Sequence, residues 1–326
     1  DPRIRHMLLF TVEQAIWGMS LMNRYSPSHF SQVNRNLSGV YYVPSQVSEV
    51  APRYILVGKI DRLISAFEPI AISMDKVLAA TDSCAALGVP SNTIDYIFTD
   101  PPFGENIFYA DLNILVESFH GVLTNPDDEA IIDSAKKKGL YEYQDLMRNC
   151  FREYHQALKP GRWMTVVFHN SKNSVWNAIQ EAMLSAGFVV ADVRMMDKQQ
   201  GSYRQVTSSA VKQDLVISAY KPSFEMVRAI ELYAGAENSA WDFIRHHLAK
   251  LPIVVLVKGV LEFIVERTVF MLFNRMVAFH VQRGLAVPLS NAEFHEGLEL
   301  RFIPRRSMYF LPDQVAEYDA ARAGAE

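Results

Sequence analysis

The feature that most constrains the fold is an alternation of short apolar runs with helical periods between about residues 76 and 222. The runs at 93–99 and 162–168 predict strands, and residues 141–158 and 175–186 predict the helices between and after them. Strands that alternate with helices usually pair in parallel and are covered by those helices. We therefore expect an α/β sheet in this part of the chain.

Three further runs complete the expected sheet. Residues 77–81 predict a short strand before 93–99, and residues 188–194 and 214–220 predict two later strands with no helix between them. Because two successive strands without a crossover helix can pair directly, they favour an antiparallel hairpin at the sheet edge.

The chain on either side of this region has a different character. Residues 4–25 carry apolar side chains at helical offsets, and short β-rich runs follow at 39–44 and 54–57, so the first part reads as a helix and an irregular segment. Beyond Pro222, helical periods dominate. We expect three parts: residues 1–70, which face the substrate; a sheet domain at 71–222; and a mainly helical, alternatively winged-helix-like, domain at 223–326.

Composition excludes several classes of protein. The 326 residues are 49% hydrophobic and 21% charged, which is ordinary for a globular chain. Cys84 and Cys150 are the only two cysteines and fit no metal motif, so we expect no metal site and a reducing, cytoplasmic location. Charged residues interrupt the apolar stretch 253–271 at helical spacing, which favours a core helix over a membrane span. The net charge of -4 does not indicate a partner.

One tetrapeptide, Asp100-Pro101-Pro102-Phe103, stands where the strand 93–99 ends. Ligands of open α/β sheets bind at the carboxyl ends of strands. Proline lacks an N–H and fixes φ, so the two prolines hold a rigid turn whose carbonyl oxygens can accept hydrogen bonds. With a carboxylate, a flat ring and the small Gly104 beside them, this Asp-Pro-Pro-Phe motif suits a planar ligand that bears an amino group, such as a nucleobase.

The segment 95–104 resembles the catalytic motif of amino-methylating DNA methyltransferases, whose pattern is Asp, Asn or Ser followed by Pro-Pro and Tyr or Phe. The order of elements after the motif also resembles this family, through Lys159-Pro160-Gly161 before one strand and Gly187 before the next. The closest resemblance is to large bacterial adenine-specific DNA methylases of restriction-modification or phage-defence systems. It covers residues 75–222, and 314–319 also resemble theirs.

The resemblance implies a Rossmann-like methyltransferase sheet and an enzyme that uses S-adenosylmethionine to methylate DNA. Asp100 and the carbonyl of Pro101 would accept hydrogen bonds from the amino group of an adenine that has left the duplex, and Phe103 would stack on it. Asp82 would bind the adenine of the cofactor, and Asp100 would also contact the cofactor. Asn106 and Tyr109, just after Gly104, would line the base pocket with it.

The family's glycine-rich turn, Phe-x-Gly-x-Gly, is missing from the sequence. The resemblance therefore implies that the chain holds the later strands of the sheet and only part of the cofactor site, and that Asp1 follows a cut in a longer protein. An upstream segment or a partner chain would complete the site. Two alternatives stay open: a cytosine amino-methyltransferase, and a DNA-binding or specificity subunit that depends on a partner for the cofactor.

Other polar segments favour simpler interpretations. Lys136-Lys137-Lys138 is more typical of a solvated helix end than of a DNA contact. Arg301, Arg305 and Arg306 fit a solvated surface as well as a phosphate site. The polar segment 198–207 is typical of a mobile loop near a substrate.

Overall fold

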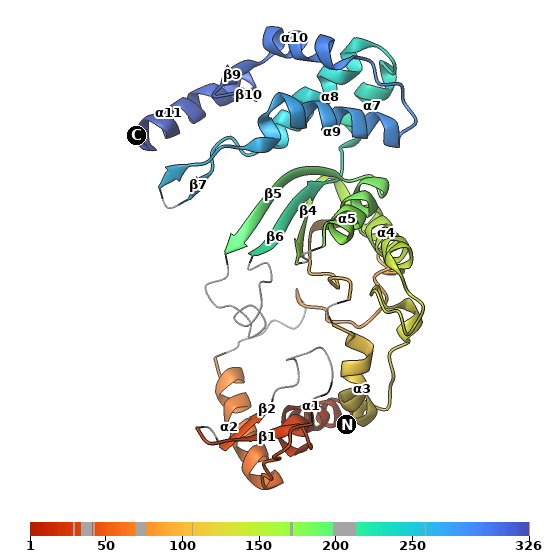
Figure 1. The fold of residues 1–326 in the computed structure, drawn as a ribbon, viewed down its shortest axis with the longest axis vertical. Helices are drawn as coiled ribbons and strands as arrows, with labels where there is room; N and C mark the ends of the chain where they lie inside the picture. The colour runs from red at the N-terminus through yellow and green to blue at the C-terminus, as the bar shows by residue number, and fades with distance from the viewer. Residues whose placement is uncertain are drawn as a thin grey trace. The chain divides into compact units, whose positions relative to one another are not determined.

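The computed structural model describes residues 1–28, 30–33, 41, 43–69, 76–105, 107–169, 172–197, 213–257 and 259–325. These residues form two compact units. The first unit contains the described residues within 1–83 and 102–146, and the second contains those within 84–101, 147–199 and 211–326. Figure 1 labels most of their helices and strands.

The second unit is built on a four-stranded mixed sheet with the order β3-β4-β6-β5. Figure 1 labels its strands β4, β6 and β5. Strand β3 (Ile94–Thr99) runs parallel to β4 (Leu158–Phe168). Strand β6 (Gln213–Tyr220) is antiparallel to β4 and to β5 (Val189–Asp197). The predicted α/β sheet and its antiparallel hairpin are therefore confirmed, and β5 is the edge strand of that hairpin.

One face of this sheet is covered over β4. Met164, Val166 and Phe168 alternate along β4 and are completely buried. Helix α5 (Asn173–Ser185) turns its apolar stripe inward at helical spacing, and its Trp176 ring lies 6.3 Å from that of Phe168. This face of the sheet therefore has the packed character expected of a central α/β strand.

The opposite face is open along β3. Tyr96 and Phe98 are 54% and 64% exposed, and the Tyr96 hydroxyl donates to Oγ1 of Thr165 on β4 over 2.7 Å. At the other end of the same face, the rings of Trp163 and Tyr220 lie 5.5 Å apart, and Tyr220 is fully buried. The cover on this face therefore does not extend across β3.

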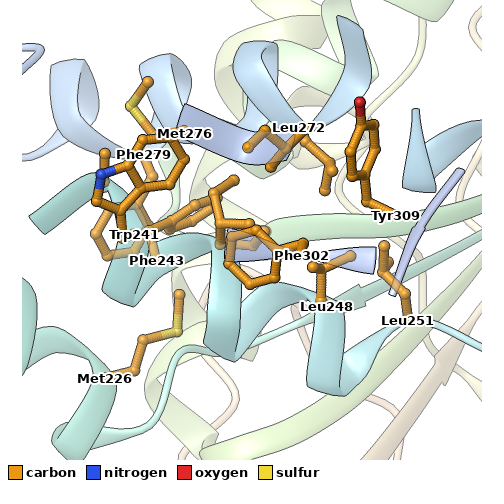
Figure 2. Close-up of a cluster of buried hydrophobic side chains, with 14 of the residues drawn as sticks. Met226, Trp241, Phe243, Leu248, Leu251, Leu272, Met276, Phe279, Phe302 and Tyr309 are labelled. Atoms are coloured by element: carbon orange, nitrogen blue, oxygen red, sulfur yellow. The ribbon is translucent and has the colours of Figure 1, made fainter. Parts of the chain in front are cut away.

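The helices after the sheet supply that cover. They are α7 (Phe224–Leu232), α8 (Glu237–Lys250), α9 (Val269–Gln282), α10 (Asn291–Arg301) and α11 (Val315–Ala325). Val315 and Tyr318 of α11 belong to a separate cluster. Side chains of α7, α8, α9 and α10 form one hydrophobic cluster with Val189, Ala191 and Tyr220 of the sheet. Figure 2 shows part of this cluster, including Met226, Phe243 and Leu272. The mainly helical character predicted for residues 223–326 is confirmed, and helices α7 to α10 share a core with β5 and β6.

A buried arginine fastens the end of the chain to α8. Arg267 is fully buried, and its guanidinium lies 4.4 Å from the centre of the Phe310 ring. It donates to the carbonyls of Leu248, Leu251 and Tyr309 and to Oε1 of Gln314, among other acceptors. Since an arginine carries five N–H donors, this site satisfies a cation that would otherwise be costly to bury.

The first unit is mainly helical and has less core. It contains α1 (Pro2–Met19), the hairpin β1 (Asn23–Ser26) and β2 (Phe30–Val33), α2 (Pro52–Phe67), α3 (Tyr109–His120) and the start of α4 (Leu140–Ala157). None of the residues of α2 is buried, while Ala15 and Ile16 of α1 are. The helix predicted within residues 4–25 is confirmed as far as Met19, whereas residues 23–25 lie in β1.

Three predicted elements are wrong. Residues 54–57 lie inside α2, whose start is set by Pro52 in the first turn, where a missing N–H costs nothing. Residues 77–81 form no strand and are exposed. Among the described strands, β3 has β4 as its one neighbour, so residues 77–81 do not pair with it. The stretch 253–271 is not a core helix: β7 (Leu256–Val257) and β8 (Val260–Leu261) form a hairpin, and Gly259 adopts φ +81° between them. None of the described helices is long and apolar enough to cross a membrane.

Candidate active site

Strand β3 delivers the start of the Asp-Pro-Pro-Phe motif to the carboxyl edge of the sheet. Thr99 is hydrogen-bonded to the Tyr154 hydroxyl of α4, and burial raises the pKa of that tyrosine above its usual range. Asp100 follows and is exposed, while Pro101 is buried. The carboxylate thus stands at the point where ligands of such sheets bind, on a strand end that α4 holds in place.

The second half of the motif is held by neighbours in the first unit. The Tyr143 hydroxyl donates to the carbonyl of Pro102 over 2.7 Å, and Tyr143 itself is fully buried. Gly104 is buried with φ +83°, a conformation that favours glycine, and its carbonyl accepts from the Ile132 amide over 3.3 Å. The carbonyl of Pro102 therefore already accepts a hydrogen bond within the protein. No pattern in the sequence had indicated Tyr143 as its donor.

The chain passes from the second unit to the first between Pro101 and Pro102. Asp100 and Pro101 belong to the second unit with the sheet. The first unit contains Asp82, Pro102, Phe103, Gly104 and Tyr109.

The other predicted site residues have more varied surroundings. Phe103 is half-buried. Tyr109 is the first residue of α3 and is 39% exposed. Asp82 is exposed and lies in no strand, so its predicted position just after a strand is wrong. Asn106 lies outside the described residues, as does the polar segment 198–207.

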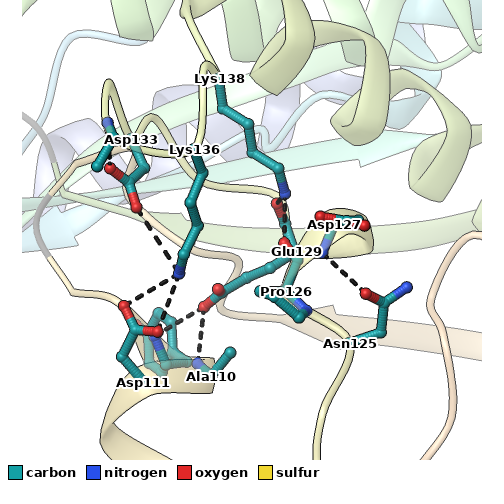
Figure 3. A network of polar contacts seen from close by, with 11 residues as sticks. Ala110, Asp111, Asn125, Pro126, Asp127, Glu129, Asp133, Lys136 and Lys138 are labelled. Atoms are coloured by element: carbon teal, nitrogen blue, oxygen red, sulfur yellow. Dashed lines mark hydrogen bonds and ion pairs between the residues drawn. The ribbon is translucent and has the colours of Figure 1, made fainter.

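A polar network fixes the loop that follows α3 to the start of that helix (Figure 3). Oε1 of Glu129 accepts from the backbone amides of Tyr109 and Ala110 at 2.7 and 3.1 Å and so caps α3. Lys136 binds the Asp111 carboxylate at 3.0 Å (Figure 3). These contacts tie the chain after the motif into one rigid arrangement.

The three consecutive lysines are not a solvated helix end. They lie in a turn before α4, and Lys137 adopts φ +56°. Lys138 is buried and donates to the carbonyls of Pro126 and Glu129 at 2.6 and 2.7 Å (Figure 3). Lys136 and Lys138 therefore stabilise the loop, and Lys137 is the exposed member of the three.

Two cavities lie within the first unit. One, of about 1090 Å³, is lined by α1, α2 and neighbouring residues. The other, of about 660 Å³, is lined by Glu105, Phe108 and residues 132–134 and 137–139, directly after the motif. Among the described residues, neither lining contains any of the predicted site residues.

The arginines near the end of the chain have protein partners. Arg301 binds Glu237 at 2.9 Å and lies over the Trp241 ring. Arg305 binds Asp319 with two nitrogens at 2.9 and 3.0 Å. Both arginines thus contribute to packing between helices and hairpin, which favours the surface interpretation over a phosphate site. The described part of the chain holds no group of three metal-ligating side chains.

Comparison with known proteins gives one family. Residues 94–249, slightly under half of the chain, match the model of the family N6_N4_Mtase, described as DNA methylase. The match begins with β3 and includes the whole Asp-Pro-Pro-Phe motif and all four strands of the sheet. No curated protein matches the chain.

Several solved structures are similar at low identity. TTHA0409 from Thermus thermophilus, named "Putative DNA Modification Methylase", is 13% identical with a TM-score of 0.27, over 46% of this chain and 58% of that one. The same protein complexed with S-adenosyl-L-methionine is 12% identical with a TM-score of 0.28, over 53% and 70%. The [4+2]-cyclase SpnF is 12% identical with a TM-score of 0.29, over 51% and 64%. The chain thus spans little more than half of the first of these structures, and such TM-scores add nothing to the argument for the fold.

Proposed function

We propose that this chain, whose residues 94–249 match a family of DNA methylases, transfers a methyl group from S-adenosylmethionine to the exocyclic amino group of adenine in DNA. The family as named covers both N6 and N4 amino groups. The choice of adenine, and the roles of single residues, are therefore part of the proposal.

The observation that carries the proposal is the position of Asp100. It is exposed at the carboxyl end of a strand whose neighbours along the sheet are ordered as β3-β4-β6-β5. An exposed carboxylate at this edge can accept a hydrogen bond from an amino group, and so can the carbonyl of Pro101. Two such acceptors localise the nitrogen lone pair, which in a free base is delocalised into the ring.

The residues of the motif have two different roles in this proposal. Asp100 and Pro101 orient the amino group, and Phe103 offers a ring on which the base stacks after it leaves the duplex. Preorganised acceptors of this kind contribute about 3 kcal/mol each to transition-state stabilisation. Tyr143 keeps the turn in shape through its bond to Pro102, so that a ligand does not have to order it.

The described residues fit only the reactive end of the cofactor. S-adenosylmethionine supplies the electrophilic methyl group on a sulfonium. Asp100 stands at the sheet edge where this group would lie, whereas a glycine-rich turn is absent from the sequence and Asp82 lies in no strand. We propose that an additional segment or a partner chain supplies the remaining contacts to the cofactor.

A second candidate function follows from the missing glycine-rich turn. A chain that lacks the glycine-rich turn can retain the sheet and bind DNA as a specificity subunit, with its partner providing the cofactor site. Titration calorimetry with S-adenosylmethionine separates the two candidates. A self-sufficient enzyme binds the cofactor by itself, and a specificity subunit binds it only after the partner is added.

Replacement of Asp100 tests the main proposal. In cells that lack adenine methylation of their own, the wild-type gene is expected to give N6-methyladenine in genomic DNA, measured by mass spectrometry of nucleosides. The Asp100→Ala variant is expected to lower this methylation at least 100-fold, because it removes a preorganised acceptor worth about 3 kcal/mol or more. Its circular dichroism and unfolding transition should match those of the wild type, since Asp100 is exposed.

Asp95 provides the matched control. It is an exposed aspartate at the other end of the same strand, where it binds Lys159 at 2.8 Å and Arg162 at 3.3 Å. Asp95→Ala is expected to leave methylation unchanged. Methylation that survives Asp100→Ala would refute the site assignment, and N4-methylcytosine in place of N6-methyladenine would refute the choice of base.

A further inference from the structure

A histidine–aspartate pair lies at the same edge of the sheet as Asp100. His169 directly follows β4, and its Nδ1 lies 2.7 Å from Oδ1 of Asp214 on β6. The side chain of Asp214 is only 4% exposed and that of His169 20% exposed. Because Nδ1 faces the carboxylate, the second polar atom of the imidazole, Nε2, lies on the opposite side of the ring.

The register of the strands places this pair next to the motif. Thr99 is the last residue of β3 and is paired with Val166 of β4, so Asp100 leaves the strand close to the level of Val167. Phe168 is the last residue of β4, and His169 follows it directly. Phe168 is paired with Leu215, so Asp214 stands opposite His169 on the other side. Three neighbouring strands therefore bring Asp100, His169 and Asp214 to one edge.

Strand alternation assigns the His169–Asp214 pair to one face of the sheet. Phe98 lies opposite Thr165 on the open face of the sheet, and successive side chains of a strand alternate between faces. Asp214 is next to Leu215, whose partner Phe168 lies on the covered face, so Asp214 is on this open face. The contact with Asp214 brings the His169 side chain to the same face. The described residues leave this face open along β3. A ligand that binds at Asp100 can therefore lie beside the imidazole of His169.

The proposed reaction needs a group with the properties of this imidazole. When the amino nitrogen bonds to the methyl carbon, the carbon–sulfur bond breaks and its electron pair stays on sulfur. The nitrogen then carries one proton more than the neutral methylamino product. A base must take that proton, and histidine is the commonest general base in enzymes.

We propose that His169 is this base: its Nε2 accepts the proton from the methylated amino nitrogen, while the carboxylate of Asp214, whose Oδ1 lies 2.7 Å from Nδ1, stabilises the imidazolium through its charge. The proton then passes to solvent, which restores the neutral ring. The same division of labour between a base and a buried carboxylate operates in hydrolases with a catalytic triad. This inference rests on the proposed function, since it assigns a role within the same reaction.

The competing explanation is that the pair only joins β4 to β6. Two substitutions distinguish these explanations, because the amide of asparagine can occupy the position of Nδ1 but has no atom at the position of Nε2. His169→Asn keeps the donor that faces Asp214, so a purely structural role predicts full activity. A proton-accepting role predicts that the same variant is impaired.

The experiment measures single-turnover methylation of a duplex with an excess of the protein, together with its partner chain if one is required. His169→Asn and His169→Ala are each expected to lower the rate constant by about 10²- to 10⁴-fold, the usual contribution of a general base. Added imidazole is expected to restore part of the rate of His169→Ala. The exposed His295 of α10 supplies the control, and His295→Asn should retain the wild-type rate.

Two readouts do not depend on turnover. Binding of S-adenosylmethionine by calorimetry, and fluorescence of 2-aminopurine at the target position, are expected to match the wild type in both His169 variants. A wild-type rate in His169→Asn, or no rescue of His169→Ala by imidazole, would overturn the role of His169 and leave the proposed function intact. A wild-type protein that binds DNA and cofactor without methylating DNA would overturn the proposed function, and this inference with it.

Discussion

Replacement of Phe103 tests the proposed stacking of the base on its ring. Stacking of a base on an aromatic side chain is worth about 1–3 kcal/mol, so Phe103→Ala should weaken binding of the extruded base by roughly 5- to 150-fold. Titration of a 2-aminopurine duplex with the protein measures this affinity. Phe103→Tyr keeps the flat ring and should bind as tightly as the wild type.

The alternative for Phe103 is a packing role, which its half-buried position also permits. In that case Phe103→Ala would lower the free energy of unfolding by about 3–5 kcal/mol, as for other large core residues. A urea unfolding curve of the same variant measures this. A large loss of stability with unchanged base affinity would contradict the stacking role.

The sequence predicted Asp100 and its motif because all the information is local: a strand, two prolines and a ring in succession. Tyr143 and His169 could not be found in this way. The partner of Tyr143 is 41 residues away in the sequence, and Asp214 meets His169 only because β6 inserts between β4 and β5. Strand order decides such contacts, and no local pattern encodes it.

At the scale of single elements, two helical glycines should respond to alanine in opposite directions. A Cβ on Gly297 of α10 would lie 2.3 Å from Cζ2 of Trp241, whose ring is stacked on Phe294 at 5.4 Å and is 3% exposed. Because that ring has no room to move, Gly297→Ala should lower the free energy of unfolding by about 1–3 kcal/mol. Urea denaturation measures the change.

Gly58 of α2 is the matched control. No atom lies within 4 Å of a Cβ built there, so Gly58→Ala should stabilise its helix by about 0.5–1 kcal/mol through helix propensity alone. Stabilisation by both substitutions would contradict the tight packing of Trp241 against α10.

The elements that were mispredicted have a common cause. Residues 54–57 and the stretch 253–271 are rich in residues that suit either a strand or a buried helix, so their short-range pattern is ambiguous. Pro52 and Gly259 decide these two cases, because one fixes a helix start and the other supplies a turn. Residues 77–81 have strand-like composition, but a strand also needs a neighbour with which to pair.

At the scale of the whole molecule, buried histidines make the free energy of unfolding depend on pH below about 6.5. Burial lowers the pKa of His155 to about 4 and that of His247 to about 3, from an ordinary 6.5. Below pH 6.5 the unfolded chain binds protons that the folded chain does not, so the free energy of unfolding should fall as the pH drops toward 4. Each such histidine contributes a slope of about 1.4 kcal/mol per pH unit.

His155→Phe isolates one of these contributions. The ring of His155 meets that of Phe188 edge to face at 5.2 Å, a contact that phenylalanine can keep. Urea unfolding between pH 4.5 and 6 should show a slope smaller by about 1.4 kcal/mol per pH unit than in the wild type. Between pH 7 and 8 the two slopes should coincide. Equal slopes in the acid range would mean that His155 is protonated in the folded protein.

The predicted division at residues 71–222 and 223–326 followed the change in periodicity, and as a domain boundary it stays a prediction. Periodicity describes elements one at a time, so it does not reveal which faces are shared. Val189, Ala191 and Tyr220 of the sheet pack in the same cluster as Met226, Phe243 and Leu272.

This shared core limits how such proteins can recombine. A crossover between two relatives at residue 222 would join a sheet from one parent to helices from the other, and the inherited side chains of the two halves would have to fit without having been selected together. Chimeras should therefore take the whole stretch from β5 to α10 from one parent. Functional diversity can then accumulate in loops outside that core.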